Sequence, residues 1–278
     1  MCLLLLALKE HPAYKLILAA NRDEFYDRPT APLGFWKSNF DLLAGRDLKA
    51  GGTWLGITRT GRLAAVTNYR DPAHPTEHAS SRGNLVLDFL RKKVPAAEYL
   101  EKIVNGEHRY NGFNIVLGSA DELFWHSNRG NGMKRLTNGV YGLSNHLLDT
   151  PWPKLKRAKR AFREVIGSGE KILPEAFFGI LGDRTVPPDD ELPDTGVGLE
   201  WERVLSPVFI SSPTYGTRSS SVILVDHKNQ VLFTERRYDG RPDRFQDTAF
   251  RFGMREKPGS EILVRDQRQA VSVTKVMQ

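Results

Sequence analysis

The sequence predicts an α+β protein built in layers. Apolar runs typical of β-strands occupy the first third of the 278-residue chain, helical patterns dominate the middle, and further strand-like runs follow. Because strands and helices are grouped in this way rather than alternating, a doubly wound parallel sheet is not expected. The chain also contains no Gly-x-Gly-x-x-Gly or phosphate-loop motif, which argues against a nucleotide-binding fold of that type.

Short apolar runs bounded by turn residues predict the strands. Residues 2–8 and 14–20 are separated by the polar turn 9–12, and residues 53–58 and 62–67 by Thr60-Gly61, so each pair predicts a hairpin. The polar run Asn21-Arg22-Asp23-Glu24 and a proline-rich loop around 28–32 follow the first hairpin. The other expected strands are 114–118, 123–126, 139–143, 208–210, 220–225 and 230–235.

Apolar residues at helical spacing predict the helices. Leu85, Leu87, Phe89 and Leu90 indicate an amphipathic helix over 84–91. The other expected helices are 96–104, 152–166 and 174–181, and the Pro-, Asp- and Gly-rich segment 183–198 is expected to be a loop. We expect a single domain over 1–237 and a peripheral, irregular C-terminal extension over 238–278, with a short strand at 270–273.

Composition excludes several classes of protein. No apolar run approaches the roughly 18 residues of a membrane span, and no basic region precedes the apolar run 2–8, so we expect a cytoplasmic protein without stable membrane insertion. The formal charge of +7 is spread along the chain, and its one cluster, 154–160, falls on a predicted helix, so nucleic-acid binding is not expected. A single cysteine excludes an intramolecular disulfide and a cysteine-based zinc cluster. No metal site is expected, and the oligomeric state is not predicted.

The position of that cysteine is unusual. Removal of Met1, which is normal before a small residue, would leave Cys2 with both a thiol and a free α-amine. These groups have ordinary pKa values of about 8.5 and about 7.7–8.0, so one residue would supply a nucleophile and a general base near neutral pH. The alternative is that Cys2 is an inert residue at the end of a strand.

Several motifs resemble the NRDE family, also called the transport and Golgi organisation protein 2 family. The signature is Ala19-Ala20-Asn21-Arg22-Asp23-Glu24-Phe25-Tyr26. Further matches, in order, are Gly51-Gly52-Thr53-Trp54-Leu55-Gly56-Ile57, Leu63-Ala64-Ala65-Val66-Thr67-Asn68-Tyr69, Tyr110-Asn111-Gly112-Phe113-Asn114, Tyr141-Gly142-Leu143-Ser144-Asn145, Tyr215-Gly216-Thr217-Arg218 and Phe233-Thr234-Glu235-Arg236. The resemblance spans residues 2 to 237.

That family is similar to the N-terminal nucleophile hydrolases of the bile salt hydrolase and penicillin V acylase type. The resemblance implies a four-layer αββα sandwich. It also implies a catalytic set, which is Cys2 as nucleophile, Asp23 holding the amine and thiol, Asn68 and Asn145 near the oxyanion, and Arg218 beside the nucleophile. The neighbouring residues Asn21, Arg22, Glu24 and Trp54 are expected to bind ligand. From the residues alone, Asn68 and Asn145 also fit ordinary turns after strands, and Arg22-Asp23-Glu24 also fits a structural ion-pair network.

The hydrolases carry an arginine where this chain has Ala20, and Arg22 is not in the same register. This departure favours a protein that binds and handles a hydrophobic or amphipathic small molecule, which the resemblance implies to be of haem, lipid or acyl-CoA type. The alternative is a Cys2-dependent amidohydrolase or thioesterase acting on non-peptide acyl amides or thioesters. No cofactor is expected to be required, and haem enters only as a ligand. A Golgi-related structural role is suggested by the family name alone.

Overall fold

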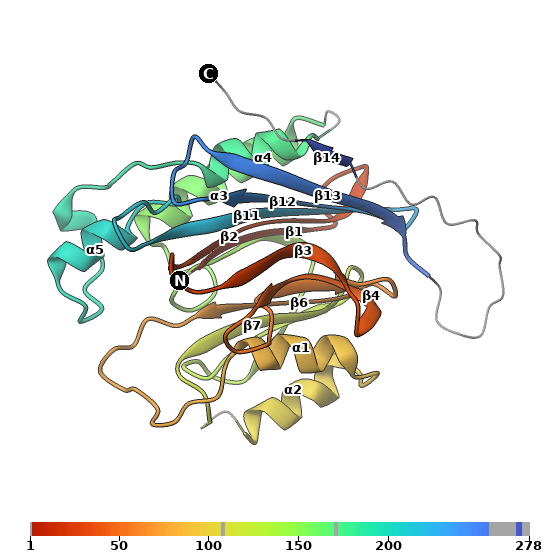
Figure 1. Ribbon diagram of the computed structural model, residues 1–278, viewed down its shortest axis with the longest axis horizontal. Helices are drawn as coiled ribbons and strands as arrows, with labels where there is room; N and C mark the ends of the chain where they lie inside the picture. Colours follow the sequence, from red (N-terminus) through yellow and green to blue (C-terminus); the bar gives the residue numbers. More distant parts are fainter. Residues whose placement is uncertain (1, 107–108, 170–171, 256–270, 274–278) are drawn as a thin grey trace.

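Four layers make up the protein. The computed structural model describes residues 2–106, 109–169, 172–255 and 271–273 (Figure 1). Two seven-stranded antiparallel sheets pack face to face. Helices α3 (Pro153–Gly167) and α4 (Pro174–Leu181) cover one outer face, and α1 (Gly83–Arg91) and α2 (Ala96–Val104) cover the other. The αββα sandwich expected from the resemblance is therefore confirmed.

The two sheets are drawn from different parts of the chain. Sheet A has the order β10 (Gly139–Leu143), β1 (Cys2–Leu8), β2 (Tyr14–Phe25), β11 (Tyr215–Asp226), β12 (Gln230–Tyr238), β13 (Phe245–Gly253) and β14 (Val271–Val273). Sheet B follows the chain as β3 (Thr30–Trp36), β4 (Asn39–Asp47), β5 (Leu55–Thr58), β6 (Arg62–Asn68), β7 (Phe113–Ser119), β8 (Leu123–Ser127) and β9 (Met133–Leu136).

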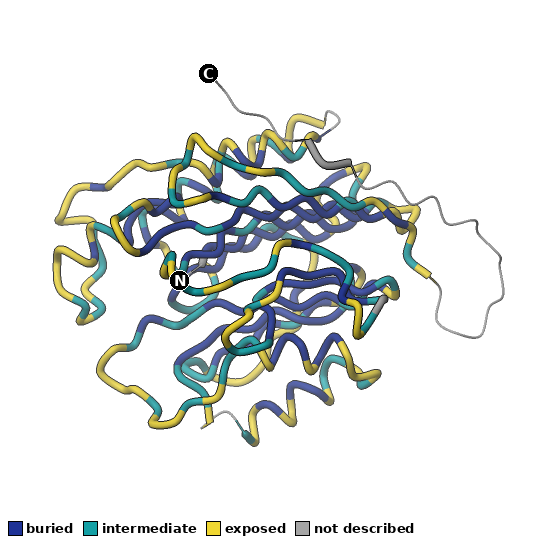
Figure 2. The backbone as a smooth tube through the Cα atoms, viewed as in Figure 1, coloured by how far each residue is buried: buried dark blue, intermediate teal, exposed yellow. Residues whose placement is uncertain are grey.

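Alternation along the strands of sheet A separates two hydrophobic cores. Leu4, Leu6 and Leu8 of β1 lie between the sheets, whereas Leu3 and Leu5 pack against α3 and α4. Because successive side chains of a strand point to opposite faces, a strand covered on both sides has to be apolar at every position. This explains why residues 2–8 form an unbroken apolar run, and Figure 2 shows these strands buried at the centre of the molecule.

Some sequence predictions about the strands were wrong. Strand β2 continues to Phe25, so Asn21-Arg22-Asp23-Glu24 lies inside a strand and not after it. Its backbone pairs with β1 on one side and β11 on the other, and this pairing outweighs the low strand propensity of Asn and Asp. The predicted proline-rich loop begins strand β3, which pairs with the unpredicted β4. Residues 208–210 form no strand.

Other differences concern short or peripheral elements. Strand β9 and the helix α5 (Leu199–Leu205) were not predicted, and a 3-10 turn, η2 (Asp189–Glu191), lies within the expected loop 183–198. Past residue 237 the chain is not irregular throughout, because β13 pairs with β12 along its whole length. Of the predicted strand 270–273, Val271–Val273 is present as β14, and residue 270 lies outside the described residues. The domain boundary at 237 stays a prediction.

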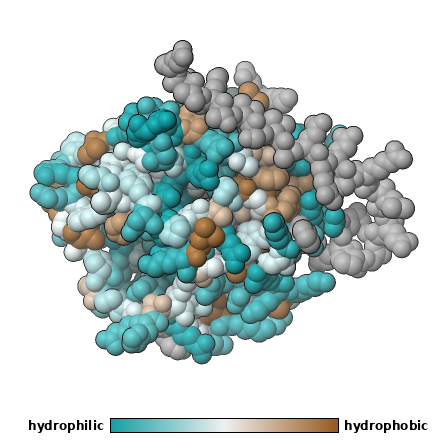
Figure 3. Space-filling model, viewed as in Figure 1, coloured by the Kyte–Doolittle hydropathy of each residue, from teal (hydrophilic) through white to brown (hydrophobic). Residues whose placement is uncertain are grey.

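Polar residues dominate the face of the molecule that Figure 3 draws. Figure 3 shows a face on which hydrophobic residues form small, separate groups. The large hydrophobic side chains that are exposed include Phe25 and Trp201. Over the described ranges, none of the helices has the length and apolar character that a membrane crossing demands.

A buried carboxyl group of sheet A is hydrogen-bonded to β3 of sheet B. Glu235 of β12 is 3% exposed, and its Oε1 accepts the backbone N–H of Leu33 at 2.8 Å. Burial raises the pKa of Glu235, against the lowering effects of that hydrogen bond and of the charges on Arg237 and Arg22. The protonated form is therefore favoured by folding.

We expect the replacement Glu235→Gln to change how stability depends on pH. A carboxyl whose pKa is raised on folding stabilises the protein below its unfolded pKa, and this contribution is lost as the pH rises through the folded pKa. Urea unfolding between pH 4 and pH 8 should therefore show a wild-type free energy of unfolding that falls relative to Glu235→Gln as the pH rises. The exposed Glu101→Gln should track the wild type, and parallel curves for all three proteins would contradict the assignment.

Candidate functional site

The first residues of β1 meet the second half of β2 at one end of sheet A. The antiparallel register pairs Cys2 with Arg22, and β11 pairs Thr217 with Asp23. A register shift between Thr217 and Ser219 places Arg218 in a β-bulge at the same end. Four predicted site positions, Cys2, Arg22, Asp23 and Arg218, are thus close along the sheet, although the side chain of Cys2 lies outside what the structure describes.

Sheet B brings Asn68 to this end, and the segment after β10 of sheet A brings Asn145. Strand β6 ends at Asn68, and the Nδ2 of Asn145, just beyond β10, donates to the carbonyl of Asn68 at 2.9 Å. Beside it, the Oγ1 of Thr67 donates to the carbonyl of Ser144 at 2.8 Å. Asn145 is fully buried. These bonds cross from one sheet to the other, so they join the sheets where the candidate site lies.

A cavity of about 300 Å³ opens here. Of the predicted residues, Arg22, Asp23, Glu24, Trp54 and Asn68 line it, which supports grouping them as a site. Asn21, Asn145 and Arg218 are not among its lining residues. The remaining wall is formed by Arg28, Asp47, Thr53, Val66, Ala79, Ser80, Ser81, Arg82, Gly83 and Asn111.

Asp23 is the most buried acid of the cavity wall, at 3% exposure. The Oγ1 of Thr217 donates to its Oδ1 at 2.7 Å. Burial raises the pKa of Asp23, while the charge of Lys154, the Thr217 hydrogen bond and the charge of Arg22 act in the opposite direction. A carboxyl group in this setting is able to hold or exchange a proton. The role that the resemblance implies for Asp23, holding the amine and thiol of Cys2, stays a prediction.

Arg22 and Trp54 form a stacked pair in the wall. The guanidinium carbon of Arg22 lies 4.3 Å from the centre of the Trp54 ring, within the range of a cation–π contact. Arg22 is 6% exposed, and its Nη2 lies 3.8 Å from Glu24. Glu24 also lies 3.6 Å from the Nε of Arg28. Of the network that the sequence left open, the Arg22–Glu24 pair is present, and Arg28 extends it along the cavity wall.

The side-chain hydrogen bonds of Asn21 connect strand β2 to neighbouring parts of the fold. Its Nδ2 donates to the carbonyls of Leu181 and Val208, each at 2.9 Å, and its Oδ1 accepts from the hydroxyl of Ser220 at 2.6 Å. These partners lie at the end of α4, in the segment before β11, and on β11 itself. The side chain is 1% exposed, and every polar atom of its amide has a partner. Its observed contacts are with the protein interior and not with the cavity.

Arg218 is engaged with backbone carbonyls. Its Nη1 lies within hydrogen-bonding distance of the carbonyl oxygens of Phe25, Tyr26 and Arg28, at 2.7, 3.1 and 3.1 Å. The guanidinium thus fastens the turn that follows β2. Burial and the charge of Arg22 lower the pKa of Arg218, against the effect of Glu24.

Sequence reasoning missed an ion pair that closes one side of the cavity. Arg28 donates to the Oδ2 of Asp47 through Nε at 3.1 Å and Nη2 at 2.6 Å. Burial alone would raise the pKa of Asp47, but the bonds from Arg28 and from the backbone N–H groups of Ala50 and Lys49 hold it below its ordinary value. In the sequence, Asp47 comes shortly before Gly51-Gly52. The turn that these two glycines predict was the one signal that could have drawn attention to this segment.

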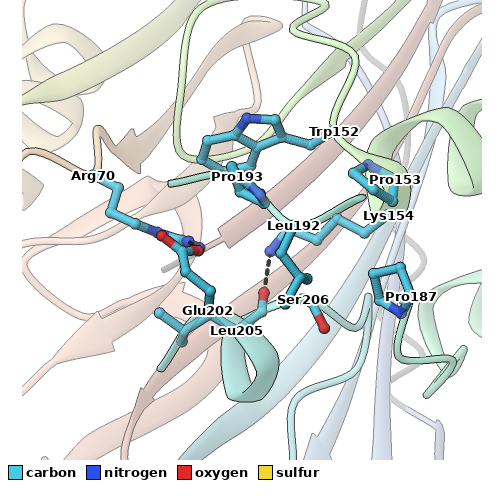
Figure 4. Close-up of a pocket in the computed structure, with 10 residues that line it drawn as sticks. All are labelled: Arg70, Trp152, Pro153, Lys154, Pro187, Leu192, Pro193, Glu202, Leu205 and Ser206. Atoms are coloured by element: carbon cyan, nitrogen blue, oxygen red, sulfur yellow. Dashed lines mark hydrogen bonds and ion pairs between the residues drawn. The ribbon is translucent and has the colours of Figure 1, made fainter. Parts of the chain in front are cut away.

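A second, smaller cavity of about 10 Å³ lies between the start of α3, the loop that contains Pro187 and Pro193, and α5 (Figure 4). Sequence reasoning missed this cavity as well. Arg70 and Glu202 form an ion pair there with both side chains 4% exposed, and Trp152 lies over the Arg70 guanidinium at 4.9 Å. The Nζ of Lys154 donates to the carbonyl of Leu205 at 2.9 Å. The backbone N–H of Arg70 also donates to the carbonyl of Asn145. This ion pair thus helps to hold the asparagine end of the site.

Metal binding has no visible support in the described ranges. No group of three or more His, Cys, Asp or Glu side chains in them is arranged to hold a metal ion.

Solved structures of hydrolases share this fold. A mutant of conjugated bile acid hydrolase from Clostridium perfringens, with cysteine replaced by alanine, superposes with a TM-score of 0.54 and 12% identity, covering 99% of this chain and all of that one. An N-acylethanolamine-hydrolyzing acid amidase orthologue from Caenorhabditis elegans superposes with a TM-score of 0.51 and 11% identity, over 80% of this chain and 92% of that one. At such identities the likeness shows the fold alone.

Sequence relatives are much closer. The Transport and Golgi organization protein 2 homolog of Bos taurus is 39% identical over 273 residues, covering 91% of this chain and 99% of that protein. The Homo sapiens homolog is 39% identical over 256 residues, with 85% and 92% covered. The Drosophila melanogaster protein is 30% identical over 268 residues, with 86% and 93% covered. The model of the Transport and Golgi organisation 2 family matches residues 1–240. The chain therefore belongs to the Transport and Golgi organisation 2 family.

Proposed function

We propose that this protein binds and handles a hydrophobic or amphipathic small molecule, of the haem, lipid or acyl-CoA type, in the cavity between the ends of the two sheets. The observation that carries the proposal is the cavity itself. Its volume of about 300 Å³ falls within the usual range of small-molecule sites. It lies where Arg22, Trp54 and Asn68 come together from both sheets, and a cytoplasmic location remains part of the proposal.

The composition of the wall fits an amphipathic ligand. Trp54 and Val66 offer apolar surface, while Arg22 and Asn68 offer polar groups a short distance away. A ligand with an apolar body and a polar end would contact both. The Arg22 guanidinium stacks on the face of the Trp54 ring, so this contact holds a charged group and an apolar group side by side in the wall.

The second candidate is hydrolysis through Cys2. The register of β1 against β2 favours it, because position 2 is held opposite Arg22 and near Asp23 at the end of sheet A. After removal of Met1, the Cys2 thiolate would attack the carbonyl carbon of an acyl amide or thioester. The α-amine would accept the thiol proton and pass it to the leaving amine or thiol, and water would then release the acyl group. The relatives in fold that are named as hydrolases support this alternative.

Two contacts and one sequence difference favour binding over turnover. The Asn145 amide donates to the carbonyl of Asn68, so one of its hydrogens is committed to the backbone and not to an oxyanion. Arg218 is engaged with the carbonyls of residues 25–28. Ala20 stands where the hydrolases carry an arginine. Transition-state stabilisation depends on the full set of groups, whereas binding tolerates such losses better.

The experiment compares the wild type with Cys2→Ser on a panel of acyl-CoA thioesters, N-acyl amides, fatty acids and haem. We expect binding by both proteins with no turnover by either, measured by calorimetry and by product analysis. Turnover by the wild type that Cys2→Ser abolishes would support the hydrolase instead. Intact mass of the protein from its native cell completes the test, because a retained Met1 blocks the α-amine that the hydrolase needs.

Trp54→Leu provides a test of the cavity. Loss of the aromatic wall should weaken binding of the panel's best ligand by about tenfold, because fully burying a large apolar side chain against a partner is worth about 1.5–3 kcal/mol. The matched control is Trp201→Leu, since Trp201 is 45% exposed on α5 and does not line the cavity. Equal affinities for the two variants would place the ligand elsewhere.

A further inference from the structure

The N-terminus of α1 opens onto the cavity. Ser80, Ser81, Arg82 and Gly83, which lead into the helix and begin it, all line the wall. No side chain caps this helix end, and its first turn contains no acidic residue. The N–H groups and the dipole of a helix N-terminus favour negative charge, so the end of α1 lacks the side-chain acceptor that commonly occupies this position.

Backbone contact fixes this helix end in place. The N–H of Thr53 donates to the carbonyl of Gly83 at 3.3 Å. A Cβ atom on Gly52 would lie 2.6 Å from the carbonyl carbon of Gly83, so only glycine allows the two segments to approach this closely. The Gly51-Gly52 turn thus holds the N-terminus of α1 against the wall that carries Trp54.

A second and independent observation comes from sheet A. Arg22 is 6% exposed and lines the same cavity, yet its Nη1 is buried and has no hydrogen-bond partner. A buried donor without an acceptor is costly, so such groups are rare in proteins and often mark a place where another molecule binds. The nearest carboxylate contact of Arg22 is with Glu24 at 3.8 Å, which is too long for a hydrogen bond.

The other charges of the wall have partners. Arg28 is held by Asp47, and the Nη1 of Arg82 donates to the carbonyl of Gly112 at 3.0 Å. Asp23 accepts a hydrogen bond from Thr217, and Glu24 lies between Arg22 and Arg28. Arg22 therefore stands out in the wall as a cation with a donor still to be used.

We propose that the cavity binds an anionic oxygen group, a carboxylate or a phosphate, between the Arg22 guanidinium and the N-terminus of α1. The inference rests on the proposed function, because the anionic group is the polar end of the amphipathic ligand. Arg22 offers charge-assisted hydrogen bonds. The N–H groups of Asn84 and Leu85 already donate to the carbonyls of Ser81 and Arg82, so the helix end contributes its favourable dipole. The ligand's apolar body then lies along Trp54 and Val66.

The test uses three probes that share a twelve-carbon chain: dodecanoate, dodecyl phosphate and uncharged dodecanol. By calorimetry on the full chain, we expect the better anion to bind about tenfold or more tightly than dodecanol, the difference that one charge-assisted hydrogen bond supplies. Arg22→Gln should remove most of this difference between the anions and dodecanol. The preferred anion identifies the ligand class as carboxylate or phosphate.

A second variant tests the anion site independently, in case Arg22→Gln fails to fold. Ser81→Asp adds a negative charge beside the helix N-terminus, where acids favour the helix, so it should weaken anion binding without lowering the melting temperature. Ser81→Asn is the control, because Asn has the shape of Asp without its charge, and it should weaken anion binding much less than Ser81→Asp.

The outcomes separate the two proposals. Equal wild-type affinity for all three probes, or anion affinity unchanged in both Arg22→Gln and Ser81→Asp, overturns the anion site and leaves the proposed function standing. Failure of all three probes to bind the wild type counts against both proposals.

Discussion

Replacing Glu202 by alanine is expected to lower the free energy of unfolding by about 3–5 kcal/mol, the usual cost of breaking a buried ion pair by removing one partner. The replacement leaves the Arg70 charge in a site where its side chain is 4% exposed. Burial already lowers the pKa of Arg70, and Glu202 opposes that effect. Glu202 also accepts from the N–H and the hydroxyl of Thr195, so the loop before α5 loses its anchor as well.

Glu200→Ala is the control for this prediction. Glu200 lies on the same helix and is exposed, so its loss should change stability by less than about 0.5 kcal/mol. Urea unfolding of both variants at one pH measures the difference. A Glu202→Ala protein as stable as Glu200→Ala would show that the pair contributes nothing. The double variant Arg70→Leu with Glu202→Leu should recover much of the loss, because no buried charge then remains.

Replacing Asn21 by leucine is expected to have the next largest effect, a loss of about 2–4 kcal/mol. Leucine has a similar size but cannot donate to the carbonyls of Leu181 and Val208 or accept from Ser220. Each buried polar group left without a partner costs about 1–3 kcal/mol. Thermal and urea unfolding measure the loss.

Asn21→Leu also tests whether Asn21 contacts the ligand or only stabilises the fold. Asn131→Leu, at an exposed position, should leave stability nearly unchanged. Below its melting temperature, Asn21→Leu should bind the ligand with wild-type affinity, because Asn21 does not line the cavity. Weaker binding by the folded variant would return Asn21 to the ligand-binding residues, where the sequence had placed it.

Most of the regular structure could be predicted from local pattern. The strands over 2–8 and 139–143 have clear apolar runs, and the helices over 96–104 and 174–181 have apolar residues at helical spacing. The structure contains each of them with the same bounds. Strand β3 and the second half of β2 contain prolines or charged residues, which local propensity assigns to loops. The second half of β2 depends on pairing with the distant strand β11, and β3 depends on pairing with β4; the local residue pattern does not reveal either pairing.

The site was predictable only in part. Family motifs led to Arg22, Asp23, Glu24, Trp54 and Asn68, and these line the cavity. The contributions of Arg28, Asp47 and the start of α1 come from segments with no chemical signature of their own. They reach the cavity because the ends of both sheets meet there. The roles of the predicted catalytic residues in turnover stay predictions.

The contrast between Asn21 and Arg22 affects how natural variants of this protein should be interpreted. The two residues are adjacent, but one bonds toward α4 and the other stacks on Trp54 in the cavity wall. A substitution at position 21 should reduce how much folded protein a cell retains, and chaperones or lower growth temperature should partly restore it. A substitution at position 22 should act mainly on ligand binding, by weakening the hold on the anionic end, so a larger ligand supply should partly restore function.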